Sequence, residues 1–174
     1  MSAVAIRLAT PTDAPALARV DVRSWQWTYQ GQVPDTYLEQ MGQTLDELIR
    51  ARRTQLEQVP PEDRWWIAED AGHLAGFAIT QPSADGDAAP LTAEVRALYL
   101  DPEAAGQGIG RTLFAHAVAD FQHRGFAEAT LWVLESNARA RHFYEAAGWA
   151  PDGGQKSEER PGFLLHEVRY RIRL

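Results

Sequence analysis

A glycine-rich turn that runs from a strand directly into a helix is the feature that most constrains how this chain folds. In residues 94–113, EVRALYLDPEAAGQGIGRTL, a β-like run ends at Asp101-Pro102, and glycines then occupy three alternate positions. Apolar side chains recur every four residues after that, which predicts an amphipathic helix. Glycines let a ligand approach the backbone, and a helix N-terminus carries partial positive charge, so the turn suits a pyrophosphate. Taken alone, such a turn is more simply explained as a tight connection that needs glycine for its backbone angles.

Two other phosphate-binding motifs do not match this turn. A P-loop ends in Gly-Lys-Ser or Gly-Lys-Thr, and the sequence has no such ending. The dinucleotide pattern G-x-G-x-x-G does not fit Gly106, Gly108 and Gly110, and that loop would normally follow the first strand of its domain. A P-loop or Rossmann-type nucleotide site is therefore not expected.

The remaining chain alternates between strand and helix patterns, with no internal repeat and no evident linker. We expect one domain over residues 1–174, with a surface loop at residues 81–90. Strands are predicted at 4–8, 64–69, 74–80, 94–100, 130–134 and from 163 onward, and helices at 11–29, 35–41, 45–57, 109–125 and 137–148. This order predicts a mixed α/β sheet flanked by helices.

Charge and composition exclude several classes of function. The 24 acidic residues outnumber the 17 basic ones and give a net charge of −7, the wrong sign for binding a nucleic-acid backbone. The same charge mildly favours a cationic substrate, although ordinary solubility explains it more simply. The sequence has no cysteine, so thiolate metal sites and a cysteine nucleophile are excluded. His116 and His123 lack the spacing of a helical metal site, and no metal is predicted.

No segment resembles a targeting signal or a membrane span. The first fifteen residues combine neither a basic region nor an apolar run, and no later apolar stretch has the length needed to cross a bilayer. A cytoplasmic protein without membrane contact is expected.

Two segments together resemble a known family. The run LYLDPEAAGQGIGRTLF, residues 98–114, resembles motif A of the GNAT acetyltransferases, and LWVLESNARARHFYEAAGW, residues 131–149, resembles their motif B. The segment IRLATPTDAPAL, residues 6–17, is similar to a frequent opening of the family. One departure is Ala105, which stands where motif A usually has Gln or Arg. The resemblance implies the GNAT fold, a mainly antiparallel central sheet with one splayed strand pair and flanking helices.

The resemblance also implies acetyl-CoA as the cosubstrate, held where strand 94–100 splays from the strand that begins near Thr130. Asn137 would contact the pantetheine arm, although it is also a good helix N-cap. The other contacts implied are Leu98, Tyr99 and Leu100 for the thioester and pantetheine, and Gly106, Gln107, Gly108, Gly110, Arg111 and Thr112 for the pyrophosphate.

Tyr144 matches the tyrosine that in many family members protonates the departing coenzyme A thiolate. A phenolic hydroxyl is a suitable proton donor for that role. The alternative is a tyrosine packed in the core beside Phe143. Core packing would be favoured for an isolated tyrosine, but the match to motif B favours the catalytic role.

Glu94 matches the strand glutamate that serves as general base in some members. Strand alternation predicts Glu94, Arg96 and Leu98 on one side of the sheet. Glu94 would then either act as a base, pair with Arg96 or be solvated. His166 is a weaker candidate for proton relay.

Four aromatic residues lie in the first predicted helix or shortly after it, in the region where relatives form the acceptor side of the cleft. Trp25 and Tyr29 are the predicted substrate residues, accompanied by Trp27 and Tyr37, although core packing explains part of this group.

The expected reaction is direct acetyl transfer to a primary amine of a small molecule or protein in a ternary complex. A non-catalytic acyl-CoA-binding regulatory module on the same fold is the alternative. The acceptor's identity stays open, and a homodimer is among the possible assemblies.

Overall fold

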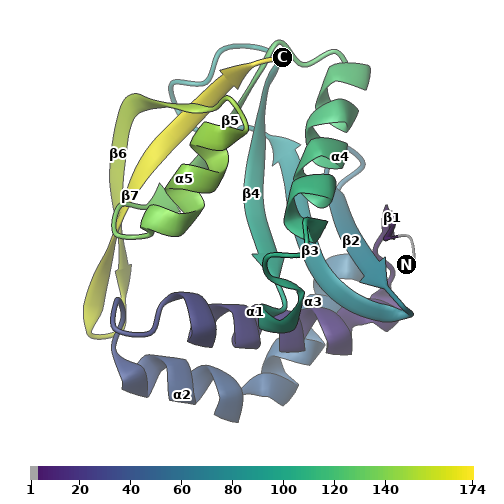
Figure 1. Ribbon diagram of the computed structural model, residues 1–174, viewed down its shortest axis with the longest axis vertical. Coiled ribbons are helices and arrows are strands. Elements are labelled where there is room, and N and C mark those ends of the chain that lie inside the picture. Colours follow the sequence, from purple (N-terminus) through teal and green to yellow (C-terminus); the bar gives the residue numbers. More distant parts are fainter. Residues whose placement is uncertain (1–3) are drawn as a thin grey trace.

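The computed structural model describes residues 4–174 and is built on a seven-stranded sheet with strand order β1-β2-β3-β4-β5-β7-β6 (Figure 1). Within these residues, only β4 and β5 pair in parallel. The mixed, mainly antiparallel sheet predicted from sequence is thereby confirmed. The strands are β1 Ala5–Leu8, β2 Arg64–Asp70, β3 His73–Pro82, β4 Thr92–Leu100, β5 Glu128–Leu134, β6 Ala150–Arg160 and β7 Phe163–Arg173.

Helices cover both faces of the sheet. On one face α4 packs on β2, β3 and β4, while α5 lies over the half of the sheet that contains β6 and β7 (Figure 1). On the other face α1 packs on β3 and β4, and α3 packs against α1. The helices are α1 Ala14–Thr28, α2 Asp35–Gln43, α3 Leu45–Glu57, α4 Ile109–His123 and α5 Ala138–Ala146, with short 3₁₀ turns at Pro11–Asp13 and Pro102–Ala104. No helix in the described part of the chain combines the length and hydropathy needed to span a bilayer.

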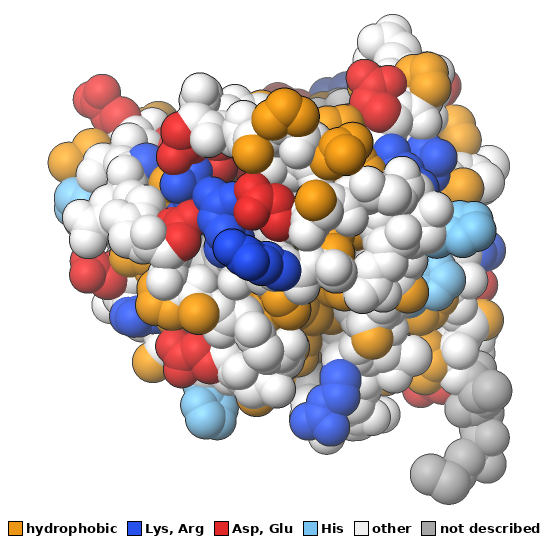
Figure 2. Space-filling model, turned by 90° about the horizontal axis from the view of Figure 1, so that it is seen from above, with side chains coloured by type: hydrophobic (Ala, Val, Ile, Leu, Met, Phe, Trp, Pro, Cys, Tyr) orange, Lys and Arg blue, Asp and Glu red, His pale blue; other side chains and the backbone are white. Residues whose placement is uncertain are grey.

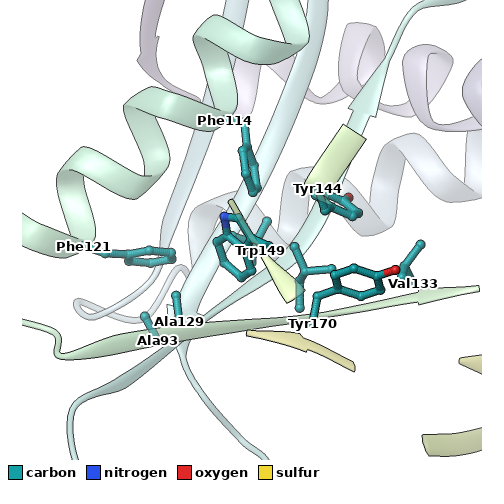
Figure 3. Packing of buried hydrophobic residues seen from close by; sticks show 10 residues of the cluster. Ala93, Phe114, Phe121, Ala129, Val133, Tyr144, Trp149 and Tyr170 are labelled. Atoms are coloured by element: carbon teal, nitrogen blue, oxygen red, sulfur yellow. The ribbon is translucent and has the colours of Figure 1, made fainter. Parts of the chain in front are cut away.

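The largest core cluster joins α4 and α5 to the sheet. Phe114 and Phe121, which the four-residue repeat of α4 places on one face, pack against β4 and β5. Trp149 follows α5 and lies between Phe114 and the small side chains Ala93 and Ala129 (Figure 3). The Phe114 and Trp149 rings are 5.3 Å apart. Burial of these large rings against small strand residues fixes both motif segments on the same face of the sheet.

The sheet splits between β4 and β5. The two strands pair only from Thr92–Glu128 to Val95–Leu131. Beyond that point β4 continues alongside β3 to Leu100, and β5 continues alongside β7 to Leu134. The predicted splay is confirmed, and it opens the sheet at the end of β4 that precedes the glycine turn.

A β-bulge in β4 changes which side chains share a face. Val95 and Ala97 lie opposite consecutive residues of β3, so Arg96 is an extra residue between them. As a result Val95 and Leu98 pack in the same cluster beneath α4, although strict alternation would separate them. The predicted grouping of Glu94, Arg96 and Leu98 on one side is wrong because the bulge shifts the period of the strand.

Residues 150–160, for which the sequence pattern predicts no element, form the edge strand β6. Almost every side chain of β6 is exposed, so the segment has no apolar alternation that would indicate a strand. Its order comes from pairing with β7 and from ion pairs. Asp152 accepts hydrogen bonds from Arg169 at 2.8 Å and from Arg171 at 2.9 Å. Figure 2 looks on this end of the molecule, where basic and acidic side chains lie together.

Candidate functional site

A cleft of about 1250 Å³ occupies the gap between β4 and β5. Its lining comes from both faces of the sheet. Helices α4 and α5 border the cleft on one face, and α1 borders it on the other. We call residues 98–111 and 137–144 the loop side of the cleft. The far side consists of lining residues on α1–α3, β3, β5, β6 and β7 together with Glu94.

The glycine turn presents its backbone to the loop side. Gly106 and Gly108 have φ of 80° and 83°, the left-handed region that favours glycine. A Cβ at Gly108 would meet no atom within 4 Å, so the space above it is open. Thr112 N–H donates to Gly108 O at 3.1 Å and makes the first backbone bond of α4. The amides of residues 109–111 precede that bond and are available to an anion at the helix N-terminus.

Gly110 has a packing role in addition to its place in the cleft lining. A Cβ at this position would lie 2.7 Å from Leu100 Cδ1, closer than packed carbons approach. Gly110 therefore lets α4 lie directly on the end of β4, which brings Leu100 and the helix N-terminus into the same cleft wall. It lines the cleft as expected, but packing also requires the glycine.

Most other predicted contacts also line the loop side. Leu98, Tyr99, Gln107 and Arg111 are among the lining residues. Gln107 Nε2 donates to Glu103 O at 2.7 Å, which holds the turn. Thr112 is the exception: it does not line the cleft, and its hydroxyl donates to Gly108 O at 3.2 Å.

Asn137 is buried, caps α5 and lines the cleft. Its Oδ1 accepts a hydrogen bond from Ala140 N–H at 3.0 Å, as an N-cap side chain does. This bond fixes the side chain, whose amide also interacts with the Tyr29 hydroxyl and partly offsets the rise in its pKa that burial causes. An amide NH₂ has two donors, so one remains for a ligand. The capping role and the ligand role are therefore compatible.

Tyr144 is both a core residue and a cleft residue. Its ring lies 5.4 Å from those of Phe114 and Phe143. Burial raises the pKa of the Tyr144 hydroxyl above its ordinary value, so the group is protonated at neutral pH. The hydroxyl has no hydrogen-bond partner within residues 4–174, so it is free to donate to a group bound in the cleft.

Glu94 is 9% exposed and lines the far side of the cleft. Gln81 Nε2 donates to its Oε2 at 3.1 Å. The side chain is thus neither solvated nor paired with Arg96, the two alternatives considered from sequence. No ion pair within residues 4–174 involves Glu94, so its carboxyl group is open to whatever enters the cleft.

Aromatic side chains form one wall of the far side. Trp25 packs edge-on to Tyr29 with centroids 4.6 Å apart, and Tyr37 lies 6.1 Å from Trp25. Burial raises the pKa of Tyr29 to about 12, which keeps the hydroxyl neutral. Trp27 is 46% exposed and lies at the rim, where the Arg139 guanidinium is 4.3 Å from its ring. All four aromatic residues line the cleft as predicted.

Charged pairs on the far side were missed from sequence. Arg52 of α3 pairs with the buried Asp21 of α1. Lys156 of β6 lies 3.5 Å from Glu167 of β7 and 4.4 Å from the Trp132 ring. No local pattern marks these residues, because each pair joins segments that only the fold brings together.

His166 lies outside the cleft. Its exposed ring is 2.9 Å from Ser157 Oγ on the hairpin of β6 and β7. This position does not suit proton relay within the cleft. Within residues 4–174 no group of three or more His, Cys, Asp and Glu side chains is arranged to hold a metal ion.

Residues 20–149 match the model of the acetyltransferase (GNAT) family, and this match covers most of the chain. The chain belongs to the GNAT family. The match includes both motif segments and all of the cleft residues named above except those of β6 and β7. Membership confirms the family predicted from motifs A and B, and it supports an acetyl-CoA-dependent acyltransferase.

Three similar proteins illustrate the relationship. The "Probable N-acetyltransferase Rv2775" of Mycobacterium tuberculosis is 30% identical over 87% of this chain and 83% of its own length. A mycothiol acetyltransferase of Thermobispora bispora is 35% identical over 64% of this chain, which spans only 37% of that protein. The PaiA N-acetyltransferase of Thermoplasma acidophilum, solved in complex with coenzyme A, has a TM-score of 0.72 at 24% identity, covering 99% of both chains. This structure shares the GNAT fold.

Proposed function

We propose that the protein transfers an acetyl group from acetyl-CoA to a primary amine of a small molecule or protein, by direct attack in a ternary complex. One observation carries the proposal: a single cleft connects a helix N-terminus suited to a pyrophosphate with Glu94 and Tyr144 at the point where β4 and β5 diverge. Acetyl-CoA supplies a thioester, whose carbonyl carbon an amine attacks.

The loop side would hold the coenzyme. The free amides after Gly108 and the Arg111 side chain would bind the pyrophosphate, and Ala105 contributes its backbone where relatives often have a side chain. The unpaired edge of β4 between Leu98 and Leu100 would bind the pantetheine. Asn137 would contact the same arm from the opposite wall.

The far side would prepare the amine. A protonated amine is not a nucleophile, so a proton must leave before or during attack. Glu94 lies buried without a cationic partner, and it would accept that proton directly or through water. The aromatic wall of Trp25 and Tyr29 would position the apolar part of the acceptor.

Tyr144 would assist departure of the coenzyme A thiolate. It lies on the loop side of the cleft, across from Glu94 on the far side, and its protonated hydroxyl has no competing partner among the described residues. An acid on one wall and a base on the other match the needs of a reaction in which an amine loses a proton and a thiolate gains one.

The test is a panel of amines assayed for thiol release with acetyl-CoA. The panel should include aminosugars, polyamines, amino acids and peptide N-termini, because fold and cofactor motifs are shared across unrelated acceptors. Steady thiol release with at least one amine supports the proposal. Tight acetyl-CoA binding without turnover on any amine would instead favour the acyl-CoA-binding module. The homodimer and the cytoplasmic location stay predictions from sequence.

A further inference from the structure

Lys156 is the only lysine in the chain, and its side chain lines the far side of the cleft. Every other basic side chain among the 17 Lys and Arg residues is a guanidinium, which is always charged and is not a nucleophile. The fold thus places the chain's one side-chain amine in a cleft where amines are proposed to be acetylated.

The position of the ammonium group is defined by two neighbours. Lys156 Nζ lies 4.4 Å from the Trp132 ring and 3.5 Å from Glu167 Oε2. Trp132 is the first residue of β5 beyond Leu131, the last residue paired with β4. The amine therefore contacts the ring of the first residue beyond the point of divergence, and it shares the cleft with Glu94.

The contacts of the Lys156 side chain are weak enough for it to change rotamer. It is 45% exposed, and it extends from β6, whose neighbouring side chains are also exposed. Partly exposed ion pairs and cation–π contacts are weak, and a lysine stem has four rotatable carbon–carbon bonds. Moving the amine away from Glu167 therefore meets little resistance.

We propose that Lys156 is an intramolecular acetyl acceptor, so that the enzyme acetylates itself at this position. The proposal rests on the proposed function. The deprotonated Nζ attacks the thioester carbonyl carbon, a C–N bond forms and the C–S bond breaks. Coenzyme A leaves as the thiolate and takes up the proton that the nitrogen loses as the amide forms. The proton lost earlier from the ammonium passes to a carboxylate such as Glu94 or Glu167 and then to water. The products are an Nε-acetyl-lysine and coenzyme A.

The experiment incubates the full chain with acetyl-CoA and follows the mass of the intact protein and of the peptide that contains position 156. We expect one acetyl group on Lys156, added at a rate that does not depend on protein concentration. Lys156→Arg keeps the positive charge beside Trp132 and should remove this modification. A heat-unfolded sample should be acetylated at least ten times more slowly.

A relocated lysine provides the matched control. In Lys156→Arg with Arg53→Lys, the single lysine stands on the exposed face of α3, outside the cleft. The lysine at position 53 should react at the slow rate of the unfolded sample. Equal rates at the two positions, a rate proportional to protein concentration, or an unmodified Lys156 would each overturn the inference.

Thiol release with external amines on the same preparation separates this inference from the proposed function. Turnover of an external amine with Lys156 unmodified overturns self-acetylation and leaves the proposed function standing. Acetylation of Lys156 without turnover of any external amine supports self-acetylation while the broader acceptor proposal fails. If neither is acetylated, both proposals are wrong.

Discussion

The loop side of the cleft comes from two segments, and its phosphate-binding part is backbone, whereas the far side is built from side chains that eight elements contribute. On the loop side, Gly108 opens the helix N-terminus and its free amides face the cleft. On the far side, Glu94, Trp132 and Lys156 come from three different strands. A group common to all reactions, such as a pyrophosphate, can be bound by backbone alone. An acceptor that differs between enzymes needs side chains, which can vary while the fold stays the same.

The largest expected effect is the loss of kcat on substitution of Glu94. It tests whether the far side takes part in proton transfer as well as in binding the acceptor. Glu94→Gln keeps the volume and the contact with Gln81 but cannot accept a proton. General base catalysis contributes about 10²–10⁴-fold, so kcat at neutral pH should fall within that range. The loss should shrink at high pH, where more of the amine is unprotonated. Glu39→Gln, at an exposed position of α2 outside the cleft, is the control. An unchanged pH–rate profile would remove Glu94 from the mechanism.

Tyr144→Phe should reduce kcat less, to the lower end of that range, about 10²-fold, because a thiolate is already a fair leaving group. Phenylalanine keeps the ring contacts, so acetyl-CoA affinity and Tm should change little. Tyr170 offers a matched control in the same core cluster, because its hydroxyl donates to Glu145 at 2.7 Å and it does not line the cleft.

Tyr170→Phe should therefore show the opposite pattern, with stability lowered by about 1 kcal/mol and kcat retained. Measuring kcat, acetyl-CoA affinity and Tm on both variants separates the two roles. Undiminished turnover in Tyr144→Phe would leave Tyr144 as a packing residue.

Gly108→Val tests the claim that the loop side binds through its backbone. A valine at a φ of 83° is strained by roughly 1–2 kcal/mol, and its side chain would project into the space kept for the pyrophosphate. Acetyl-CoA affinity, measured by calorimetry, should fall about tenfold or more. A tenfold fall corresponds to a loss of about 1.4 kcal/mol of binding free energy.

Gly125→Val is the matched control for this change. Gly125 follows the other end of α4, has a φ of 81° and has open space around its Cβ position. Both variants should lose similar thermal stability, but only Gly108→Val should lose acetyl-CoA affinity. Equal affinity in the two folded variants would show that the phosphate-loop assignment is wrong.

The smallest expected effect is at the aromatic wall. Trp25→Leu removes the contacts with Tyr29 and Tyr37, and aromatic pairs contribute about 0.5–1.5 kcal/mol each. The KM for the amine should rise up to about tenfold with acetyl-CoA affinity unchanged, because 1.4 kcal/mol corresponds to a factor of ten. Phe126→Leu, outside the cleft beside Phe121, controls for loss of an aromatic pair. A rise in the acetyl-CoA dissociation constant would contradict the separation of the two sides.

Most of the fold could be predicted because its elements carry local signals. Apolar side chains at helical spacing placed α4, and the Asn137 cap and Gly148 bounded α5. The edge strand β6 could not be predicted, since a polar segment becomes a strand only when β7 supplies its hydrogen-bond partners. The bulge at Arg96 is likewise a property of two paired strands.

The sequence by itself determined the family, the glycine turn and the two strands that diverge at the cleft. These features could be predicted because motifs A and B are each continuous in the chain and depend on glycine backbone angles, helix caps and short-range periodicity. Only the tertiary structure decided that Glu94 lies buried beside Gln81, that Thr112 stays out of the cleft and that Lys156 enters it. These outcomes depend on strand register and on segments far apart in the chain, and a one-residue bulge is enough to change them.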